Sequence, residues 1–181
     1  HRLNGNFMQW HPLQLNCSVV IARNAIQIMD TQHEKVSRSN ASVYSFMFVI
    51  WKKSGDAFAA ISTSGEIFII SSSTLQIITR FQDQLPIQQT SLETSHPAAA
   101  HHYQLGEMYV DWNMKGDRLV STANHSHNHY LCVWDVNEGK LLVRLFGHKS
   151  FITSVLWISD HRIASSSKDH TIKVWEVIEN T

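Results

Sequence analysis

Three residue types near the end of the chain could together perform nucleophilic catalysis. His148 is followed by Ser165, Ser167 and Asp169, which are the histidine, serine and aspartate that a hydrolytic triad needs. In such a triad the histidine takes the proton of the serine hydroxyl, and the aspartate orients the imidazole ring. No nucleophile elbow of the type G-x-S-x-G surrounds either serine, so the pattern alone does not favour a hydrolase.

A second chemical possibility is metal binding by His125, His127 and His129, which alternate in the segment HSHNH. Alternate side chains of an extended hairpin lie on one side, and three imidazole nitrogens placed there could bind zinc. The chain has 12 histidines in all, many of them in loop-like segments. Solvated loop histidines are therefore the favoured interpretation, and we expect neither a resident metal nor another cofactor.

Composition argues against several classes of function. The chain has 181 residues, of which 43% are hydrophobic and 17% charged, and its 15 basic residues balance its 15 acidic ones. Proteins that hold nucleic acid or an anionic membrane by bulk electrostatics need a basic excess, which this chain lacks. Its apolar runs are far shorter than the roughly 20 residues that cross a bilayer. The chain has only two cysteines, Cys17 and Cys132, so a disulfide framework is not expected. We therefore expect an intracellular location, in the nucleus or the cytoplasm.

The tryptophans reveal an internal repeat. Trp51 opens WKKSGDAF and Trp112 opens WNMKGDRL, so both begin the phrase W-x-x-x-G-D-x-apolar. Missing such a repeat would lead to the wrong fold class, because repeated units stack on one another instead of packing around one core. All six tryptophans fall on two positions of one template, with Trp10, Trp51, Trp112 and Trp157 on the first and Trp134 and Trp175 on the second.

The spacing of the repeat predicts short antiparallel units. Trp10 and Trp51 are 41 positions apart, and Trp112 and Trp157 are 45 apart. Within each unit, β-rich runs are separated by Gly, Asp, Asn and Ser, as in consecutive hairpins, and no segment keeps a helical period over three turns. Four short strands in about 41 residues are typical of a β-propeller blade. The sequence therefore predicts an all-β propeller of four-stranded antiparallel blades, with about four blades present.

We expect these blades to span approximately residues 7–40, 43–83, 103–148 and 151–181 of a single propeller segment. Residues 84–102 are rich in Gln, Ser, Thr, Ala and His and have almost no apolar pattern, which indicates an inserted surface loop. One blade cannot bury both faces of its small sheet, so neighbouring blades must stack.

The last unit resembles a WD repeat over residues 142–177. Gly147–His148 precede its first strand, and Val174–Trp175–Glu176 close its third strand, with glutamate in place of the usual aspartate. Residues 103–139 resemble a second repeat, which ends in Val133–Trp134–Asp135 but has no preceding Gly–His pair. The two earlier units keep the spacing without the signature. The chain is thus similar to the WD-repeat β-propeller family.

WD propellers usually have seven blades, so the resemblance implies that these four are part of a larger ring. The chain begins HRLNGNFMQW and stops after the third strand of its last blade, at WEVIENT, which leads us to expect a segment of a longer protein. A closed ring of four blades is the alternative. A half ring would leave apolar faces and a strand edge in water, and something would have to cover them.

The resemblance also gives the triad-like residues a structural role. In WD repeats the histidine, a second-strand serine or threonine, a turn aspartate and the tryptophan form a hydrogen-bonded chain. Such a chain satisfies polar groups that stacking would bury. Carried over to this sequence, its members are His148, Ser165 or Ser167, Asp169 and Trp175.

A docking face is implied as well. Partners of WD propellers commonly bind around the channel mouth, at positions three and five residues after the histidine and one before the turn aspartate. The matching residues are Phe151, Thr153 and Lys168 in the last repeat, Gly106 and Met108 in the one before it, and Ser45 and Met47 in the second unit. For Phe151 the alternative is packing under the neighbouring blade.

We therefore expect a non-catalytic scaffold that binds other proteins, including peptides docked on the propeller face, as a WD-repeat subunit of a multi-protein eukaryotic complex. The alternative is an RNA- or chromatin-associated propeller, in RNA processing, ribosome assembly or a histone-modifying complex. Basic residues are scattered and interspersed with acidic ones, so direct nucleic-acid binding is not favoured, and no membrane association is expected. RNA binding that weakens with salt would support the alternative.

Overall fold

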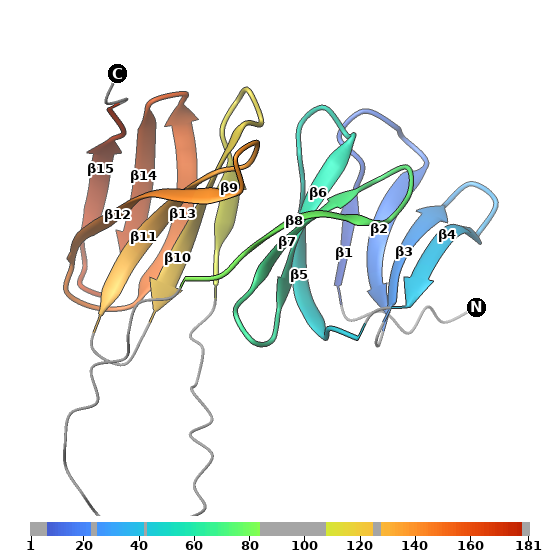
Figure 1. Ribbon diagram of the computed structural model, residues 1–181, viewed down its shortest axis with the longest axis horizontal. Coiled ribbons are helices and arrows are strands. Elements are labelled where there is room, and N and C mark those ends of the chain that lie inside the picture. The colour runs from blue at the N-terminus through green and yellow to red at the C-terminus, as the bar shows by residue number, and fades with distance from the viewer. Residues whose placement is uncertain (1–6, 23–24, 42, 84–107, 125–127, 179–181) are drawn as a thin grey trace, which may run out of the picture.

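The computed structural model describes residues 7–22, 25–41, 43–83, 108–124 and 128–178 of the chain. All fifteen regular elements in these ranges are β-strands, which confirms the predicted all-β class. They form three antiparallel sheets of four strands and one of three (Figure 1). The same ranges contain no helix that is long and apolar enough to span a membrane. The expected loop at 84–102 lies outside the described residues.

We number the sheets in chain order. The first sheet consists of β1 (Phe7–Trp10), β2 (Cys17–Ala22), β3 (Ala25–Asp30) and β4 (Lys35–Ala41), and the second of β5 (Phe46–Trp51), β6 (Ala57–Ser62), β7 (Ile67–Ser71) and β8 (Ile77–Phe81). The third sheet consists of β9 (Val110–Trp112), β10 (Arg118–Asn124), β11 (His129–Asp135) and β12 (Lys140–His148), and the fourth of β13 (Ile152–Ser159), β14 (Arg162–Ser167) and β15 (Ile172–Glu176).

The sheets follow one another in an open arc. Within each sheet the strands are hydrogen-bonded in chain order. First strands meet at the first and third junctions, since β1 contacts β5 and β9 contacts β13. Figure 1 shows the first and fourth sheets at opposite ends of this arc. The chain is thus a partial propeller, not the closed ring of four blades that the sequence left as an alternative.

The tryptophans of the repeat occupy corresponding places in the sheets. Each of the four first-strand tryptophans lies opposite the second residue of the second strand of its own sheet. In the third sheet that residue is Leu119, and Trp134 pairs with it from the other side. Ile163 has the same place in the fourth sheet, between Trp157 and Trp175. The repeated spacing of the tryptophans in the sequence therefore corresponds to a repeated strand register in the sheets.

Three hydrophobic clusters lie at the three junctions between successive sheets. Each cluster joins the side of one sheet that carries its first-strand tryptophan, which we call the tryptophan face, to the opposite side of the preceding sheet, which we call the aliphatic face. Representative pairs are Val19 and Ile21 against Trp51 and Phe58, Ile67 and Ile69 against Trp112 and Leu119, and Val120 and Val133 against Trp157 and Ile163. Stacking thereby removes both faces of each inner sheet from water.

Indole hydrogen bonds reinforce two of these junctions. Trp51 Nε1 donates to the backbone oxygen of Gln9 at 3.2 Å, and Trp112 Nε1 donates to that of Ile50 at 3.3 Å. Both acceptors belong to the residue just before the first-strand tryptophan of the preceding sheet. Each of these hydrogen bonds thus ties a sheet to the equivalent position on the sheet before it.

The Gly–Asp phrase forms the turn after the first strand. Gly55 has a φ of +74° and its N–H donates to the oxygen of Lys52 at 2.9 Å. A left-handed residue in a tight turn favours glycine. A Cβ at this position would also lie 2.2 Å from Cε1 of His11. The His11 ring is fixed there, because its Nε2 lies 3.1 Å from the Gly55 oxygen and it packs at a tilt against the Trp51 ring, with centroids 4.6 Å apart.

Substitution of Gly55 by alanine should therefore lower the free energy of unfolding by more than the strain of a left-handed alanine alone. Gly139 also has a positive φ, +67°, but its nearest neighbour is one hydroxyl oxygen, Thr79 Oγ1 at 3.0 Å. We expect Gly139→Ala to lower the free energy of unfolding by about 1–2 kcal/mol and Gly55→Ala by about 3 kcal/mol, since the latter must displace the His11 ring. Urea denaturation measures both, and equal losses would contradict the packing described here.

Candidate functional site

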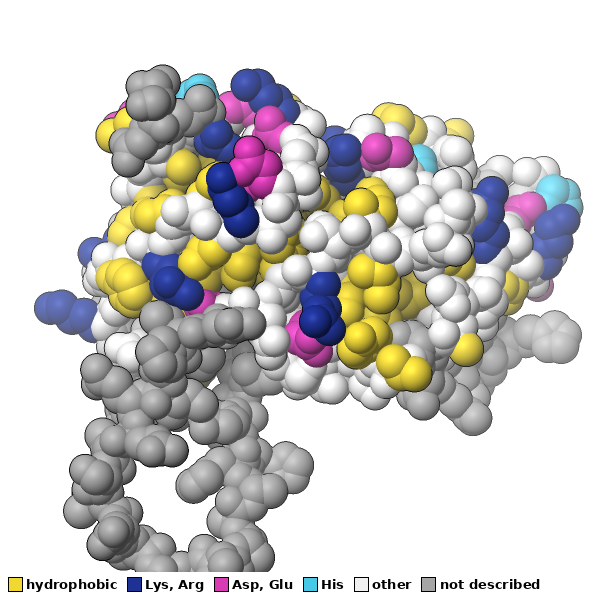
Figure 2. Space-filling model, viewed as in Figure 1, with side chains coloured by type: hydrophobic (Ala, Val, Ile, Leu, Met, Phe, Trp, Pro, Cys, Tyr) yellow, Lys and Arg dark blue, Asp and Glu magenta, His cyan; other side chains and the backbone are white. Residues whose placement is uncertain are grey.

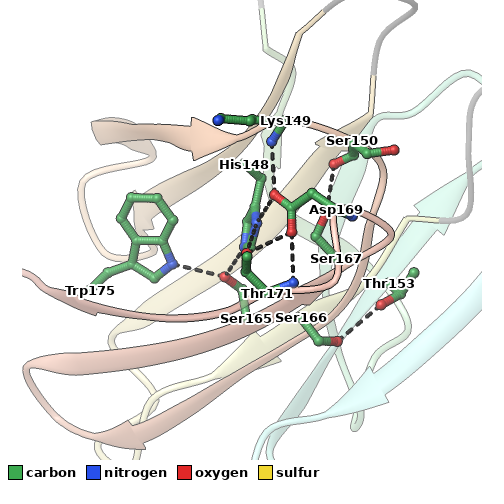
Figure 3. Close-up of polar contacts among 10 residues, drawn as sticks. All are labelled: His148, Lys149, Ser150, Thr153, Ser165, Ser166, Ser167, Asp169, Thr171 and Trp175. Carbon is green, nitrogen blue, oxygen red and sulfur yellow. Dashed lines mark hydrogen bonds and ion pairs between the residues drawn. The ribbon is translucent and has the colours of Figure 1, made fainter.

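The polar residues singled out from the sequence meet beside the junction of the third and fourth sheets (Figure 3). His148 ends β12, Ser165 and Trp175 lie on β14 and β15, and Asp169 lies in the turn between these two strands. His148 Nε2 is 2.8 Å from Ser165 Oγ, and its Nδ1 is 2.8 Å from Asp169 Oδ2. Trp175 Nε1 donates to Ser165 Oγ, also at 2.8 Å.

One direction of donation satisfies all of these atoms. The indole N–H of Trp175 donates to Ser165 Oγ, the serine hydroxyl donates to Nε2 of a neutral His148, and the Nδ1–H of His148 donates to Asp169. The histidine side chain is completely buried, and Ser165 is buried as well. The chain of hydrogen bonds therefore removes the desolvation penalty that unpaired groups would incur here.

Asp169 anchors this chain to its turn. Its carboxylate accepts bonds from the Thr171 hydroxyl at 2.6 Å, from the Thr171 N–H at 2.9 Å and from the Lys149 N–H at 2.9 Å. The hydroxyl of Thr171, together with the Lys149 N–H and His148, outweighs the effect of burial and holds the pKa of Asp169 well below its ordinary value. The aspartate is thus ionised and available as an acceptor for His148 at neutral pH.

Ser167 is not part of the link between His148 and Trp175. Its hydroxyl donates to the backbone oxygen of Ser150 at 2.9 Å and accepts the N–H of Asp169 at 3.1 Å. Of the two serines that the sequence left open, Ser165 is the one beside the imidazole, whereas Ser167 shapes the turn.

The distances around His148 match those of a hydrolytic triad, but a substrate could not reach the serine oxygen. A nucleophilic serine must present its oxygen to a substrate, whereas Ser165 is only 3% exposed. The Trp175 indole also donates to the same oxygen, so an attacking lone pair is already engaged. What this arrangement can do chemically is hold three strands together.

The third sheet retains half of this chain, which the sequence analysis did not identify. Trp134 Nε1 donates to Ser121 Oγ at 2.9 Å, and both side chains are buried. Ser121 stands two residues after Leu119, as Ser165 stands two residues after Ile163. That shared offset is the sequence signal that could have found it.

Comparison with known proteins agrees with this geometry. The family model of the WD domain, G-beta repeat, matches residues 139–176, the segment that contains His148, Ser165 and Trp175. The F-box/WD repeat-containing protein sel-10 of Caenorhabditis elegans is 41% identical over 64 residues, which are 35% of this chain and 10% of that protein. A ribosome biogenesis protein WDR12 homolog of Culex quinquefasciatus is 46% identical over 39 residues, 22% of this chain and 9% of that protein.

A solved structure extends the likeness to nearly the whole chain. The β-propeller domain of Myceliophteria thermophila Cps50 (Swd1) superposes with a TM-score of 0.72 at 15% identity, over 96% of this chain and 54% of that one. Residues 139–176 thus match the WD repeat, and the fold of the described chain is that of a β-propeller. The chain spans about a tenth of the length of the two curated WD relatives and about half of the solved propeller.

A second polar cluster joins the second and third sheets. Asp83, just after β8, accepts bonds from Arg144 Nε at 3.1 Å and from the hydroxyl of Tyr130, and Cys132 Sγ lies 3.4 Å away. Burial acts to raise the pKa of Asp83, but the bonds from Arg144, Tyr130 and Cys132 outweigh it and the net shift is downward. Burial and the nearby aspartate raise the pKa of both Tyr130 and Cys132. Sequence spacing gave no signal for this cluster.

Phe151 lies at the face from which partners of WD repeats were expected to dock. It is 37% exposed, between the ring of His129 at 4.8 Å and Lys168, whose Nζ lies 5.5 Å from the phenyl centroid. The N–H of Lys168 donates to the Phe151 oxygen at 2.8 Å, which fixes the β14–β15 turn beside the ring. The ring thus packs partly on the third sheet and keeps an open side.

Two other docking candidates of the WD repeats sit at irregularities of first strands. The register shifts between Phe46 and Phe48 and between Ile152 and Ser154, so Met47 and Thr153 occupy equivalent bulges. Bulges re-aim side chains. The side chain of Met47 is exposed. That of Thr153 lies beside Ser166, with 3.0 Å between the two hydroxyl oxygens.

The remaining sequence candidates have different outcomes. Met108 is half-buried and packs against the cluster between the second and third sheets. Gly106, His125 and His127 lie outside the described residues. Of the three alternating histidines only His129 is described, and its ring contacts Phe151. Within the described ranges, no group of three histidine, cysteine or acidic side chains could hold a metal.

Removal of the Ser165 hydroxyl should destabilise the last WD repeat. Ser165→Ala leaves the buried N–H of Trp175 and the ring of His148 without their partner, so we expect a loss of about 1–3 kcal/mol in the free energy of unfolding. Ser166→Ala, at the neighbouring and less buried position, is the matched control and should change it by less than about 0.5 kcal/mol. Denaturant titration of both variants provides the test, and indistinguishable midpoints would count against the hydrogen-bonded chain.

The Asp83 cluster should make stability depend on pH in the acid range. The pKa of Asp83 in the folded state lies below its ordinary value of 3.8, so its contribution to stability is complete above that value and is lost as the pH falls through and below it. Asp83→Asn should lower the free energy of unfolding by about 1–3 kcal/mol at neutral pH, and the difference from wild type should shrink toward about pH 3. A difference that stays constant on acidification would show that ionisation of Asp83 contributes nothing.

Proposed function

We propose that this chain is a non-catalytic scaffold of a multi-protein eukaryotic complex, located in the nucleus or cytoplasm, and that its partners are proteins or peptides that dock on the face containing Phe151. The described residues of that face are Phe151, Thr153, Lys168, Met108 and Met47. The family supports the scaffold role, because WD-repeat propellers generally act by binding.

The observation that carries the proposal is an exposed aromatic ring held in a fixed position. Phe151 is fixed by the His129 ring on one side and by the turn of Lys168 on the other, yet more than a third of it stays in contact with water. A pre-positioned aromatic side chain loses little conformational entropy on binding and is a frequent anchor of protein interfaces. The ammonium group of Lys168 beside it favours an apolar peptide side chain flanked by an acidic group.

The directions of the strands support a shared docking face. Strands β5, β9 and β13 begin at the same side of the arc, where β6, β10 and β14 end (Figure 1). Met47 and Thr153 lie at the start of their strands, Met108 lies just before β9, and Lys168 just after β14. A partner that spans successive sheets could therefore contact all of them.

The names of two relatives support a role in a multi-protein complex. One is called a ribosome biogenesis protein and the other an F-box/WD repeat-containing protein. The distribution of charge favours a protein over a nucleic acid as the direct partner. Figure 2 shows Lys and Arg side chains scattered among acidic and apolar ones on the face that it presents. Lys52 and Arg144 are also paired with Asp56 and Asp83.

Replacement of the aromatic anchor should release partners without unfolding the chain. The tagged chain would be expressed in eukaryotic cells as wild type, Phe151→Ala, Lys168→Ala and Met114→Ala, and the recovered proteins quantified by mass spectrometry. We expect Phe151→Ala to reduce recovery of specific partners roughly tenfold, and Lys168→Ala to reduce it less. Met114 is an exposed side chain in the turn between β9 and β10, at the other end of the strands, so Met114→Ala is the control. Equal recovery by the Phe151 and Met114 variants would contradict docking at this face, and recovery of RNA that declines with salt would favour the nucleic-acid alternative.

A further inference from the structure

A small hollow lies between the first and second sheets, at the ends of the strands opposite the proposed docking face. Its volume is about 170 Å³, and its walls include Cys17 and Ile28 of the first sheet and Trp51 of the second. The turns β1–β2, β5–β6 and β7–β8 surround it, and Figure 1 shows the first two of these turns on the same side of the arc. Both walls are therefore sheets that the structure describes.

Arg38 gives this hollow its charge. No other arginine, lysine or acidic residue is among the described residues that line it. Arg38 lies opposite Ile28 on the aliphatic face of the first sheet, which packs on the second sheet. Its side chain is exposed and makes no hydrogen bond or ion pair with another described residue. Burial raises the pKa of the Cys17 thiol and the charge of Arg38 acts against that rise, which places the guanidinium near the thiol.

Packing between sheets does not require an arginine at this register position. In the second sheet the equivalent outer-strand residue, opposite Ile69, is Thr79. In the third sheet it is Val143, opposite Val133. A threonine and a valine thus serve the same place at the other two junctions, so the charge of Arg38 is available for a ligand.

The neutral groups beside Arg38 add hydrogen-bond donors. Both ring nitrogens of His11 are engaged by backbone groups, so the imidazole fixes the turn and offers no free donor. The side-chain amide of Gln14 has no hydrogen bond to another residue of the described ranges. The Ser73 hydroxyl, 3.0 Å from that of Ser71, can accept from Ser71 and donate into the hollow. Guanidinium, amide and hydroxyl donors therefore line one hollow.

We propose that this hollow binds the phosphate group of a phosphorylated serine or threonine side chain on a partner protein. A guanidinium group binds two phosphate oxygens at once, and the third terminal oxygen of a phosphate monoester accepts from Gln14 or Ser73. A carboxylate has only two oxygens and would leave these donors unused. Ile28 and Trp51 supply apolar contacts for the carbon atoms next to the phosphate. A nucleotide does not fit, because sites for ligands of that size have volumes of roughly 300–1,000 Å³.

The chain that carries the phosphate has room beside the hollow. Arg38 and Gln14 also line a second hollow of about 440 Å³ on the first sheet. Asp30 is the one acidic residue there, and its carboxylate accepts the N–H groups of Gln32 and His33 within its own turn. Asp30 is thus already compensated, and the second hollow suits the residues that flank a phosphorylated side chain.

The test is a titration of the isotope-labelled chain, in buffer without phosphate, followed by nuclear magnetic resonance. N-acetyl-O-phosphoserine amide should cause saturable shifts at the backbone N–H groups of Gln14, Cys17 and Ser73, and N-acetylserine amide should cause none. Arg38→Gln should weaken binding roughly tenfold or more, and Ser73→Ala by a smaller factor, because a charge-assisted hydrogen bond contributes more than a neutral one.

Arg80→Gln is the matched control. It removes an arginine from the outer strand of the second sheet, where Arg80 Nη1 lies 3.6 Å from Glu66, and should bind as wild type does. The dispersion of each spectrum checks that the variants are folded. No saturable shift with the phosphoserine compound, or equal binding by Arg38→Gln and wild type, would overturn the proposal.

Two further compounds test the chemistry of the ligand. Inorganic phosphate should bind more weakly than the phosphoserine compound, because it lacks the carbon atoms that contact Ile28 and Trp51. N-acetylglutamate amide should also bind more weakly, since its carboxylate has one oxygen fewer. Equal binding of inorganic phosphate would overturn the assignment to a phosphorylated side chain, and equal binding of the glutamate compound the assignment to phosphate. The hollow lies away from Phe151, so these results are independent of docking at that face.

Discussion

A small sheet with apolar side chains on both faces cannot bury either of them by itself, and the rest of this structure depends on that constraint. Each sheet needs a neighbour on both sides, and the first-strand tryptophan supplies the recurrent contact. Trp112 heads the fully buried large side chains among the described residues, and its indole N–H reaches the backbone of the preceding sheet. A large ring that packs and also donates one hydrogen bond fixes both the distance and the register between sheets.

Stacking also buries polar groups, and three sets of hydrogen bonds satisfy many of them, although Trp157 Nε1 at the third junction is buried without a partner among the described residues. The first junction uses the side chain of Gln9, which accepts the backbone N–H of Trp51 at 2.8 Å. The second junction uses the ionised Asp83, just after β8, and Arg144 on β12 of the next sheet. The last WD repeat uses the chain from Trp175 to Asp169 through His148. All three solutions obey the same rule, since a buried donor without an acceptor would cost more than the bond itself contributes.

The proposed function assigns binding to the parts of the sheets that stacking does not use. The hydrophobic clusters lie between sheets, so strand ends and turns at the docking face carry little of the packing. Phe151 and Met47 can therefore stay exposed without weakening the core.

The sequence by itself determined the strands, the period and the places of the tryptophans, because these follow from local alternation and from turn residues such as Gly55 and Gly116. It also placed His148, Ser165 and Asp169 within reach of one another, through the resemblance of residues 142–177 to one repeat. It could not choose Ser165 over Ser167, since alternation puts both serines on one side of the strand. Only the tertiary structure decided that choice. It also decided the open arc, and the meeting of Asp83 with Arg144 across 61 positions, because contacts between sheets depend on how whole faces stack and leave no period in the sequence.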